Sequence, residues 1–581
     1  MAKMTPSEAM VESLVAEGVS AVMGIVGSAF MDPLDLFPAA GIRFVPVRHE
    51  QAAAHMADGY ARSTGRTAVC IGQNGPGVSN MVTSVAAAYH AHSPMVVITP
   101  SATTGSVYLD GFQETDQLKM FQGITKYQIR VPRPDRMAET MRTAFRIAQA
   151  ELGPVQVDVP RDYWYGDCDD DVLDTFQYRT SNRGPGPSAA VDRAAQLLVD
   201  AKFPVIVSGY GVVVSNAFSE VSELAESLAA PVVNSYLHND SFPQDHELAA
   251  GPIGYMGSKA GMRLLSEADV VLAIGCRMNV FGTVPQYGLD FFPSSASLIQ
   301  IDIDPRQIGR TKRIELGIIG DAAETTRQIT QRLATKQPIP EDEKAKRRNR
   351  IATEKENWAK ELRQLSSNDG SPVSPRRALD ELASVLPVET IVTTDIGNIC
   401  SLANGYLQFT KPRKFLAAMN FGNCGFAYPA ALGAKLANPE HPAVALVGDG
   451  AWAMGLEEVM TAVEEDLPAI GIVFNNRQWG AEKRNQIDFY GERFVGTNIG
   501  RDVGGFNFAD IAAAMKAESR RVESSDELKD AYVWALGEDA PVVLEIMVDP
   551  EELAEPFRRD ALQPPRRLLP KYTHLDLTAA G

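Results

Sequence analysis

Two polar motifs follow apolar runs in the last third of the chain. Gly448-Asp449-Gly450 comes directly after the run 443–447, and Asn475-Asn476 comes 24 residues later, after the run 470–474. A right-handed crossover of this length places two strands side by side and parallel. We therefore expect Asp449 and Asn476 to meet at the carboxyl edge of a sheet, where doubly wound sheets bind ligands. A carboxylate and an amide oxygen suit Mg²⁺ that bridges phosphate oxygens.

A second candidate lies near the other end of the chain, where His49 and Glu50 follow the short apolar run 44–47. The residues after them, 51–63, have helical spacing. Glu50 in this place is either a general acid–base group or a first-turn carboxylate stabilised by the helix dipole. The residue alone does not decide between the two.

Three units of alternating strands and helices must position these side chains. Strands are expected at 44–47, 67–71, 95–99 and 154–159, at 205–208, 232–234, 270–274 and 298–303, and at 390–394, 415–418, 443–447, 470–474 and 542–546. Short apolar strands between helices predict parallel sheets covered on both faces. We expect an α/β protein with three doubly wound parallel-sheet domains.

The expected domain boundaries follow composition. An N-terminal domain at 1–181 is followed by an Asn-Arg-Gly-Pro-Gly-Pro linker signal and a middle domain at 188–335. A charge-dense segment at 336–372 is predicted to be an exposed helix and linker. A third domain spans 373–555, and a proline- and arginine-rich tail spans 556–581.

Composition limits the partners and the compartment. The formal net charge of −18 disfavours nucleic acid and anionic membranes as partners. We expect no membrane span, because no apolar run approaches the length of about 18 residues that a spanning helix needs. The five cysteines are scattered and odd in number, and the chain begins without the apolar stretch of a signal peptide, which together favour a cytoplasmic protein.

The Gly-Asp-Gly and Asn-Asn motifs at this spacing, together with Glu50, resemble those of the thiamin diphosphate-dependent enzymes of the acetolactate synthase type. The resemblance implies thiamin diphosphate and Mg²⁺ as cofactors, with Asp449, Asn476 and the backbone carbonyl of Gln478 as metal ligands. The residues it places at the cofactor are Val26, Pro76, Asn80, Asp395, Gly397, Asn398, Gly422, Cys424, Gly448, Asp449, Gly450, Ala451, Trp452, Asn476 and Gln478.

The same resemblance implies catalytic roles. The Glu50 carboxyl group would hydrogen-bond a ring nitrogen of the cofactor and start the proton relay that generates its carbon nucleophile. His49 would shuttle protons, and Gln113, in a Phe-Gln-Glu segment, would lie near the reacting centre. Cys424 stands where acetolactate synthases carry a methionine beneath the bent cofactor, and a small hydrophobe there leaves more room.

Within the family, segments such as 24–29, 71–77, 475–483 and 555–562 are most similar to the sulfoacetaldehyde acetyltransferases. That resemblance implies addition of sulfoacetaldehyde to the cofactor, elimination of sulfite and transfer of the acetyl group to phosphate. Candidate anion-binding residues are Lys483, Arg484, Arg558 and Arg559. The alternatives left open are a 2-oxo acid decarboxylase or acetolactate synthase-like ligase, and a non-catalytic nucleotide-binding or regulatory protein on the same scaffold.

The resemblance also bears on the middle domain and on assembly. Acetolactate synthases hold FAD in this domain, but the match around 277–282 is partial, so bound FAD is not favoured, and another nucleotide stays open. In the family, the glutamate of the first domain faces the metal site of the last domain across two subunits. We therefore expect a homodimer or a homotetramer with its active sites between chains.

Overall fold

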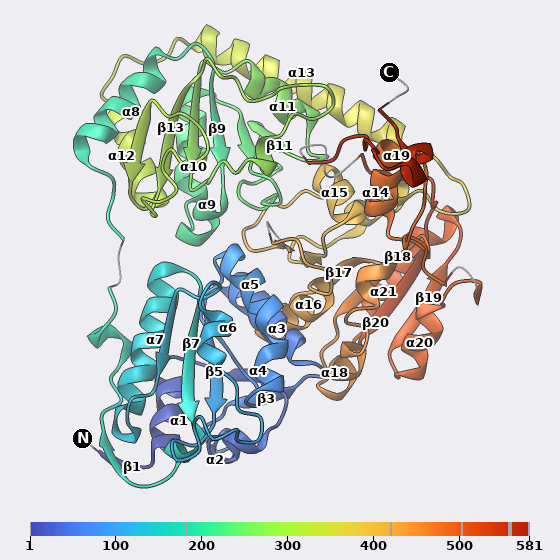
Figure 1. The fold of residues 1–581 in the computed structure, drawn as a ribbon. Helices are drawn as coiled ribbons and strands as arrows, with labels where there is room; N and C mark the ends of the chain where they lie inside the picture. Colours follow the sequence, from blue (N-terminus) through green and yellow to red (C-terminus); the bar gives the residue numbers. More distant parts are fainter. Residues whose placement is uncertain (1, 181–182, 419–420, 501–502, 556–560, 579–581) are drawn as a thin grey trace.

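The computed structural model describes residues 2–180, 183–418, 421–500, 503–555 and 561–578. Three domains follow one another along the chain, and each is built on a six-stranded sheet whose neighbouring strands are all parallel. Figure 1 shows the N-terminal domain in blue and cyan, the middle domain in green, and the C-terminal domain in orange and red. The predicted α/β class with three parallel-sheet domains is confirmed.

The N-terminal sheet has the order β3-β2-β4-β5-β7-β6. Its strands are β2 (Ala21–Gly24), β3 (Arg43–Pro46), β4 (Ala68–Ile71), β5 (Met95–Ser101), β6 (Tyr127–Arg130) and β7 (Pro154–Pro160). Its helices are α1 (Pro6–Ala16), α2 (Met31–Leu36), α3 (Glu50–Thr64), α4 (Pro76–Asn80), α5 (Val82–Ala91), α6 (Gln117–Phe121) and α7 (Met137–Glu151). A short antiparallel ribbon joins β1 (Ala2–Met4) to β8 (Cys168–Asp170).

The middle sheet has the order β11-β10-β9-β12-β13-β14, which is the strand order of dinucleotide-binding folds. Its strands are β9 (Pro204–Ser208), β10 (Val232–Asn234), β11 (Ala249–Pro252), β12 (Val270–Ile274), β13 (Ser297–Asp302) and β14 (Leu316–Ile319). Its helices are α8 (Ser188–Asp200), α9 (Tyr210–Ser215), α10 (Phe218–Leu228), α11 (Lys259–Ser266) and α12 (Ala322–Leu333), and the long α13 (Glu341–Leu365) lies in the charge-dense segment.

The C-terminal sheet, β16-β15-β17-β18-β20-β19, repeats the order of the N-terminal sheet element for element. Its strands are β15 (Ile391–Thr394), β16 (Phe415–Ala417), β17 (Ala443–Gly448), β18 (Ile470–Asn475), β19 (Glu518–Val522) and β20 (Val542–Met547). Its helices are α14 (Pro375–Val385), α15 (Asn398–Tyr406), α16 (Ala427–Ala437), α17 (Asp449–Trp452), α18 (Glu458–Glu464), α19 (Gly480–Tyr490), α20 (Phe508–Ala514) and α21 (Leu528–Gly537).

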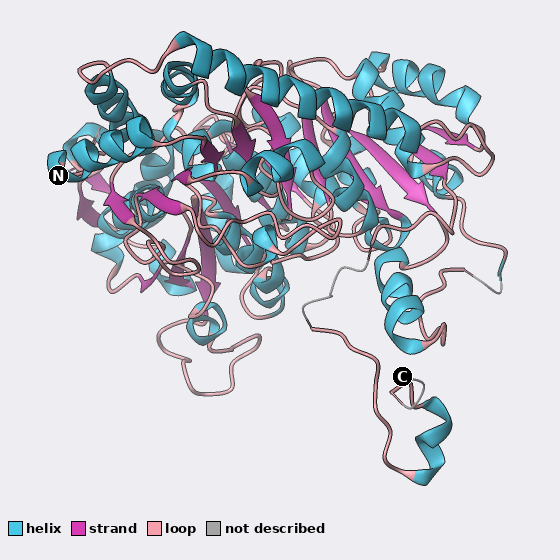
Figure 2. Ribbon diagram, turned by 90° about the horizontal axis from the view of Figure 1, so that it is seen from above, coloured by secondary structure: helices cyan, strands magenta, loops and turns pink. Residues whose placement is uncertain are grey.

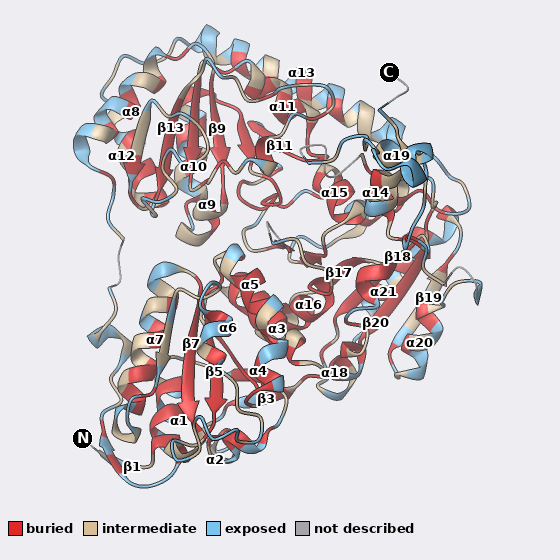
Figure 3. Ribbon diagram, in the orientation of Figure 1, coloured by how far each residue is buried: buried red, intermediate tan, exposed pale blue. Residues whose placement is uncertain are grey.

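Burial explains why these segments form interior strands. β9, β12 and β18 are buried along their whole lengths, and Figure 3 shows the sheets as the buried layer of each domain, with exposed faces on α13 and on the outer helices. Continuous β-branched and aliphatic runs suit strands that are covered on both faces. The hydrophobic effect therefore fixes the three sheets, and the loops at their carboxyl edges are left to carry polar side chains.

Helices α3 and α16 join the N-terminal domain to the C-terminal domain by direct backbone contact. A Cβ atom at Gly59 would lie 2.7 Å from the carbonyl carbon of Ala430, and one at Gly433 would lie 2.6 Å from the carbonyl carbon of Met56. Glycine at both crossing points is what permits this approach. The two helices therefore act as one seam, and α3 starts at Glu50, the candidate acid–base residue.

The described part of the C-terminal tail lies outside the body of the three domains. Its short 3-10 helix, η8 (Pro570–Leu575), stands away from the sheets in Figure 2. Arg493 donates a hydrogen bond to the carbonyl of Leu575 at 3.1 Å, which ties the tail to the loop after α19. Among the residues described, no helix is long and apolar enough to cross a membrane.

Candidate functional site

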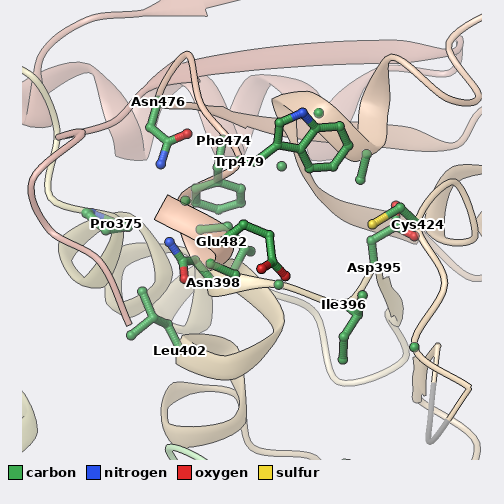
Figure 4. Close-up of a pocket in the computed structure, with 18 of the residues that line it drawn as sticks. Pro375, Asp395, Ile396, Asn398, Leu402, Cys424, Phe474, Asn476, Trp479 and Glu482 are labelled. Atoms are coloured by element: carbon green, nitrogen blue, oxygen red, sulfur yellow. The ribbon is translucent and has the colours of Figure 1, made fainter. Parts of the chain in front are cut away.

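A cavity of about 740 Å³ opens at the carboxyl edge of the C-terminal sheet. Loops after β15, β17 and β18 form its floor, the start of α19 forms one wall, and middle-domain residues Tyr236 and Phe281 close another side. Figure 4 shows Asp395, Asn398, Cys424, Asn476, Trp479 and Glu482 around this space. The other predicted cofactor residues that line it are Gly397, Gly422, Gly448, Asp449, Gly450, Ala451 and Gln478.

The turn after β15 carries Asp395 and opens helix α15. Gly397 has φ of 132°, a conformation that side-chain-bearing residues rarely adopt, and α15 begins at the next residue. The Asp395 Oδ1 atom accepts hydrogen bonds from the amides of Phe426, at 2.7 Å, and Ala427, at 3.3 Å. Asp395 thereby fixes the end of the loop that presents Cys424 to the cavity.

The turn after β17 buries a second carboxylate, Asp449. Its Oδ1 accepts from the amide of Gly450 at 2.9 Å, and its Oδ2 accepts from the amide of Gln478 at 3.1 Å. Burial raises the pKa of the Asp449 carboxyl group to about 7. No Lys or Arg among the described residues forms an ion pair with it. A buried carboxylate without a cation is costly, so this position suits a ligand that brings positive charge.

The two asparagines after β18 have different surroundings. Asn475 donates to Glu545 Oε1 at 2.6 Å and accepts from the amide of Arg477 at 3.0 Å, which folds the loop back so that Gln478 reaches Asp449. The side chain of Asn476 instead faces the cavity (Figure 4). Asn475 therefore stabilises the conformation of this loop through its two hydrogen bonds. Sequence reasoning missed Glu545, although an acidic residue inside the apolar strand β20 is a recognisable signal.

A second cluster gathers the candidates of the N-terminal domain. Glu50 is buried at the first position of α3, and its Oε2 accepts a hydrogen bond from Asn80 Nδ2 at 2.9 Å. Pro76 begins α4 beside them. Gln113 has φ of 63° and accepts from Gln73 Nε2 at 2.8 Å. These side chains meet at the carboxyl edge of their own sheet, and none of them lines the C-terminal cavity of the same chain.

His49 and Val26 lie at the edges of this cluster. His49 is the N-cap of α3, and its Nδ1 accepts from the amide of Gln51 at 3.2 Å. Val26 is 54% exposed in the loop after β2. The capping bond gives His49 a local structural task that the sequence reading did not include.

Several predicted residues do not line the cavity. Trp452 is buried in the core, where its ring centroid lies 5.0 Å from that of Tyr428, and Trp479 takes the place at the cavity wall. Lys483 donates to Gln478 Oε1 at 2.6 Å, and Arg484 pairs with Asp488 at 3.1 Å. Arg558 and Arg559 lie outside the described residues.

The charged side chains that line the cavity are all acidic. The lining includes five carboxylates, at Asp395, Asp449, Glu482, Asp549 and Glu552, and among the described residues no Lys or Arg. Lys483 and Arg484 do not line this cavity, and their contact with substrate anions stays a prediction.

Each domain matches a family profile of known proteins. Residues 4–120 match the N-terminal TPP binding domain of thiamine pyrophosphate enzymes, residues 191–329 match the central domain, and residues 395–546 match the C-terminal TPP binding domain. The chain belongs to the thiamine pyrophosphate enzyme family. Thiamine pyrophosphate is the cofactor also called thiamin diphosphate, so the resemblance found in the sequence is confirmed.

Relatives of this thiamine pyrophosphate enzyme cover nearly its whole length. It is 50% identical to sulfoacetaldehyde acetyltransferase of Castellaniella defragrans, over 98% of this chain and 97% of that protein. It is 49% identical to the protein of the same name from Alcaligenes xylosoxydans xylosoxydans, with the same coverage. It is 34% identical to a probable acetolactate synthase large subunit of Methanocaldococcus jannaschii, over 94% of this chain and 93% of that protein.

The cavity of this thiamine pyrophosphate enzyme has the features that a metal-bound diphosphate requires. Asp395 Oδ2 is buried without a hydrogen-bond partner, and Asp449 has no cationic neighbour. A Cβ atom at Gly448 would meet nothing within 4 Å, so the space beside the turn is open. The described residues contain no cluster of three His, Cys, Asp or Glu side chains. The expected ligand set differs, since it has one carboxylate, one amide and one backbone carbonyl.

A second cavity, of about 450 Å³, lies at the carboxyl edge of the middle sheet. The first turn of α9 and the loop after β12 touch at the point where the strand order reverses, because the amide of Gly211 donates to the carbonyl of Gly275 at 3.0 Å. Arg277, Asp302 and Asp304 line the space beside this contact. This is the edge at which doubly wound sheets bind ligands.

Proposed function

We propose that the protein is a sulfoacetaldehyde acetyltransferase, which converts sulfoacetaldehyde and phosphate into acetyl phosphate and sulfite. The observation that carries the proposal is that five proteins of this name, one of them named as probable, are 40–50% identical to this chain over 97–98% of its length. Three acetolactate synthase large subunits, two of them named as probable, are less similar, at 32–34%. The reaction breaks a carbon–sulfur bond and forms an acyl phosphate without net oxidation, so FAD is not required.

In this proposal, the C-terminal domain holds Mg²⁺ and the diphosphate. Asp449, the amide oxygen of Asn476 and the backbone carbonyl of Gln478 would bind the metal ion, whose charge offsets the carboxylates of the lining. The start of α15 would offer amide N–H groups to the phosphates. When bound, thiamin diphosphate supplies a carbon nucleophile that attacks the aldehyde and carries the two-carbon unit to phosphate. Asp395, whose Oδ2 is buried without a partner at the cavity, would contact the cofactor, whereas Asn475 would fix the loop that carries Gln478.

The N-terminal domain would supply the acid–base group. Glu50 is the candidate because it is buried, held by Asn80, and placed at a sheet edge with Gln113 nearby. Its carboxyl group would hold and move a proton at a ring nitrogen of the cofactor. Cys424 would lie beneath the cofactor as a small apolar surface. His49 would relay protons from the surface, since its ring is partly exposed.

The positions of the two halves of the site support a homodimer. The cavity of one chain is not lined by its own Glu50 cluster. We propose that the N-terminal domain of a second copy faces it, in a dimer or a tetramer. The strongly exposed apolar residues Tyr108, Leu109 and Phe112, beside Gln113, support a covered surface at this edge. The five free cysteines support a cytoplasmic location.

The test is a product assay on the purified protein with thiamin diphosphate, Mg²⁺, phosphate and sulfoacetaldehyde. We expect sulfite and acetyl phosphate in equal amounts, and no turnover by the Glu50→Gln variant, which should still bind the cofactor. Decarboxylation of pyruvate without sulfite release from sulfoacetaldehyde would refute the proposal in favour of a 2-oxo acid decarboxylase or synthase. Binding without any turnover would favour a non-catalytic protein.

A further inference from the structure

The turn that introduces Glu50 is held by a carboxylate from another domain. Glu458, at the start of α18 in the C-terminal domain, accepts the amide N–H of Arg48 at 3.0 Å and that of His49 at 3.0 Å through Oε1, and the Arg48 amide also reaches Oε2 at 3.3 Å. Its other oxygen, Oε2, accepts the hydroxyl of Thr461 at 2.6 Å. Arg48 and His49 directly precede Glu50, so the two amides belong to the last peptides before helix α3.

Glu458 is an acidic side chain buried between two domains. Its side chain has no exposed surface, and among the described residues no Lys or Arg forms an ion pair with it. Burial raises the pKa of its carboxyl group to about 7. Tyr428 of α16 and Glu457 are the charged or titratable neighbours that interact with it, together with the amides already named. A buried acid is expensive, and a merely apolar junction would not need one.

Two ion pairs also connect α18, and the residue that follows it, to this part of the N-terminal domain. The Arg48 guanidinium pairs with Glu464, at the end of α18. Arg43, on the strand before the turn, pairs with Glu465 at 2.9 Å. These two ion pairs are partly exposed, and such pairs contribute little. The Glu458 side chain itself is fully buried, and, unlike these ion pairs, it accepts hydrogen bonds from the backbone just before the helix start.

We propose that Glu458 is a positioning residue for Glu50. Through it, the C-terminal domain fixes the orientation of the acid–base group in the N-terminal domain of the same chain. The inference rests on the role proposed for Glu50. The N-cap and the residue before it determine how a helix begins. Glu50 is the first helical residue, so a displaced N-cap moves its carboxylate relative to Asn80 and to the cofactor. A misplacement of about 1 Å is enough to lower a rate by roughly a hundredfold.

Three substitutions of Glu458 weaken its hydrogen bonds to the Arg48 and His49 amides to different extents. Glu458→Gln keeps an acceptor oxygen in nearly the same shape. Glu458→Asp keeps the charge but withdraws the oxygens by about one C–C bond, roughly 1.5 Å. Glu458→Ala leaves both amides without a partner. The matched control is Glu464→Ala, which removes only the ion pair to Arg48 from the same helix.

Two measurements are made on each variant. Amide hydrogen exchange at residues 48–50, in the protein without cofactor, reports whether the turn is held. Turnover of sulfoacetaldehyde, with kcat and KM separated, reports whether the turn matters. We expect protection and kcat to fall in the same order, with wild type and Gln highest, then Asp, then Ala, and with kcat of the Ala variant reduced tenfold or more. KM should stay within twofold, and Glu464→Ala should match wild type in both measurements.

The outcomes separate this proposal from the one on which it rests. A variant that loses amide protection but keeps its kcat would overturn the positioning role, as would one that loses kcat with protection intact. Should Glu458→Ala fail to fold, the Asp and Gln variants still give the order. If Glu50→Gln keeps full turnover, the role proposed for Glu50 fails, while hydrogen exchange in the Glu458 variants still shows whether the contact holds the turn.

Discussion

The substitution Gly433→Ala tests whether the seam between α3 and α16 sets the geometry of both domains. Gly433 lies in α16, where alanine is the better helix former by about 1 kcal/mol. On local grounds the change should therefore stabilise the protein. The seam predicts the opposite, because the added methyl group would point at the backbone of α3.

The magnitude follows from the distances. The new Cβ would lie 2.6 Å from the carbonyl carbon of Met56, and closer to its oxygen. Carbon atoms in contact prefer about 3.6 Å, so the helices must separate by about 1 Å. Both obstacles are backbone, which cannot rotate away. Overpacking of this kind costs about 1–3 kcal/mol, and we expect the upper end, about 3 kcal/mol. The shift would also move Glu50, so kcat should fall.

The assay is urea unfolding followed by tryptophan fluorescence, with hydrogen exchange along α3 as a local probe. The matched control is Gly537→Ala, which lies at the end of α21 in the same domain with nothing within 4 Å of its Cβ. This control should be neutral or slightly stabilising. The reasoning is refuted if Gly433→Ala unfolds within 0.5 kcal/mol of wild type and keeps its kcat.

Three further expectations can be checked with purified variants. Asp449→Asn should weaken Mg²⁺-dependent binding of thiamin diphosphate by roughly a hundredfold, which titration calorimetry measures. The cofactor-free variant should be no less stable to unfolding than wild type, since a buried charge is removed. Unchanged cofactor binding would contradict the proposed metal site. Asn475→Ala should cost about 1–3 kcal/mol because it leaves Oε1 of the buried Glu545 without the Asn475 donor. Unfolding that matches wild type would contradict a stabilising role for this bond. Burial raises the pKa of Glu458 from 4.5 to about 7, so its contribution to the free energy of unfolding should be greatest below pH 4.5, fall by about 3 kcal/mol as pH rises to 7, and then level off. When unfolding is measured against pH, Glu458→Gln should lack this decrease. An equal decrease in both proteins would rule out Glu458 as its source.

Sequence patterns located every interior strand except β2, because such strands are buried on both faces, and they also located the edge strands β3 and β16. The patterns missed five strands of the three parallel sheets, and also β1 and β8 of the short antiparallel ribbon. Four of those five, β6, β11, β14 and β19, lie at an edge of their sheet. Edge strands carry polar residues, as Glu518–Val522 shows, and so lack the continuous apolar run. The fifth, β2, is buried but only four residues long.

Within the site, motifs predicted what is local in the sequence. The turns after β15, β17 and β18 all reach the cavity, because a residue that follows a parallel strand is placed by the sheet itself. The direction of Lys483 could not be predicted this way. Ala481 and Glu482 line the cavity, but each helical residue turns by about 100°, which carries Lys483 toward Gln478 instead.

Contacts between distant segments were also beyond the motifs. The bond from Glu545 to Asn475 spans 70 residues, and that from Glu458 to Arg48 spans 410. Nothing in the local pattern around Glu458 distinguishes it from the neighbouring acidic residues of α18. Only the packed domains show which carboxylate is buried and which amides it accepts.

The contact between α3 and α16 has the reciprocity of a two-fold axis. Gly59 meets the carbonyl three residues before Gly433, and Gly433 meets the carbonyl three residues before Gly59. Both helices follow the second strand of sheets with the same strand order. The first and last domains thus dock as an isologous pair does, although their sequences differ and one chain contains both. The chain is a tethered pseudo-dimer, so each side of the seam has a counterpart: Gly59→Ala should reproduce the defect of Gly433→Ala.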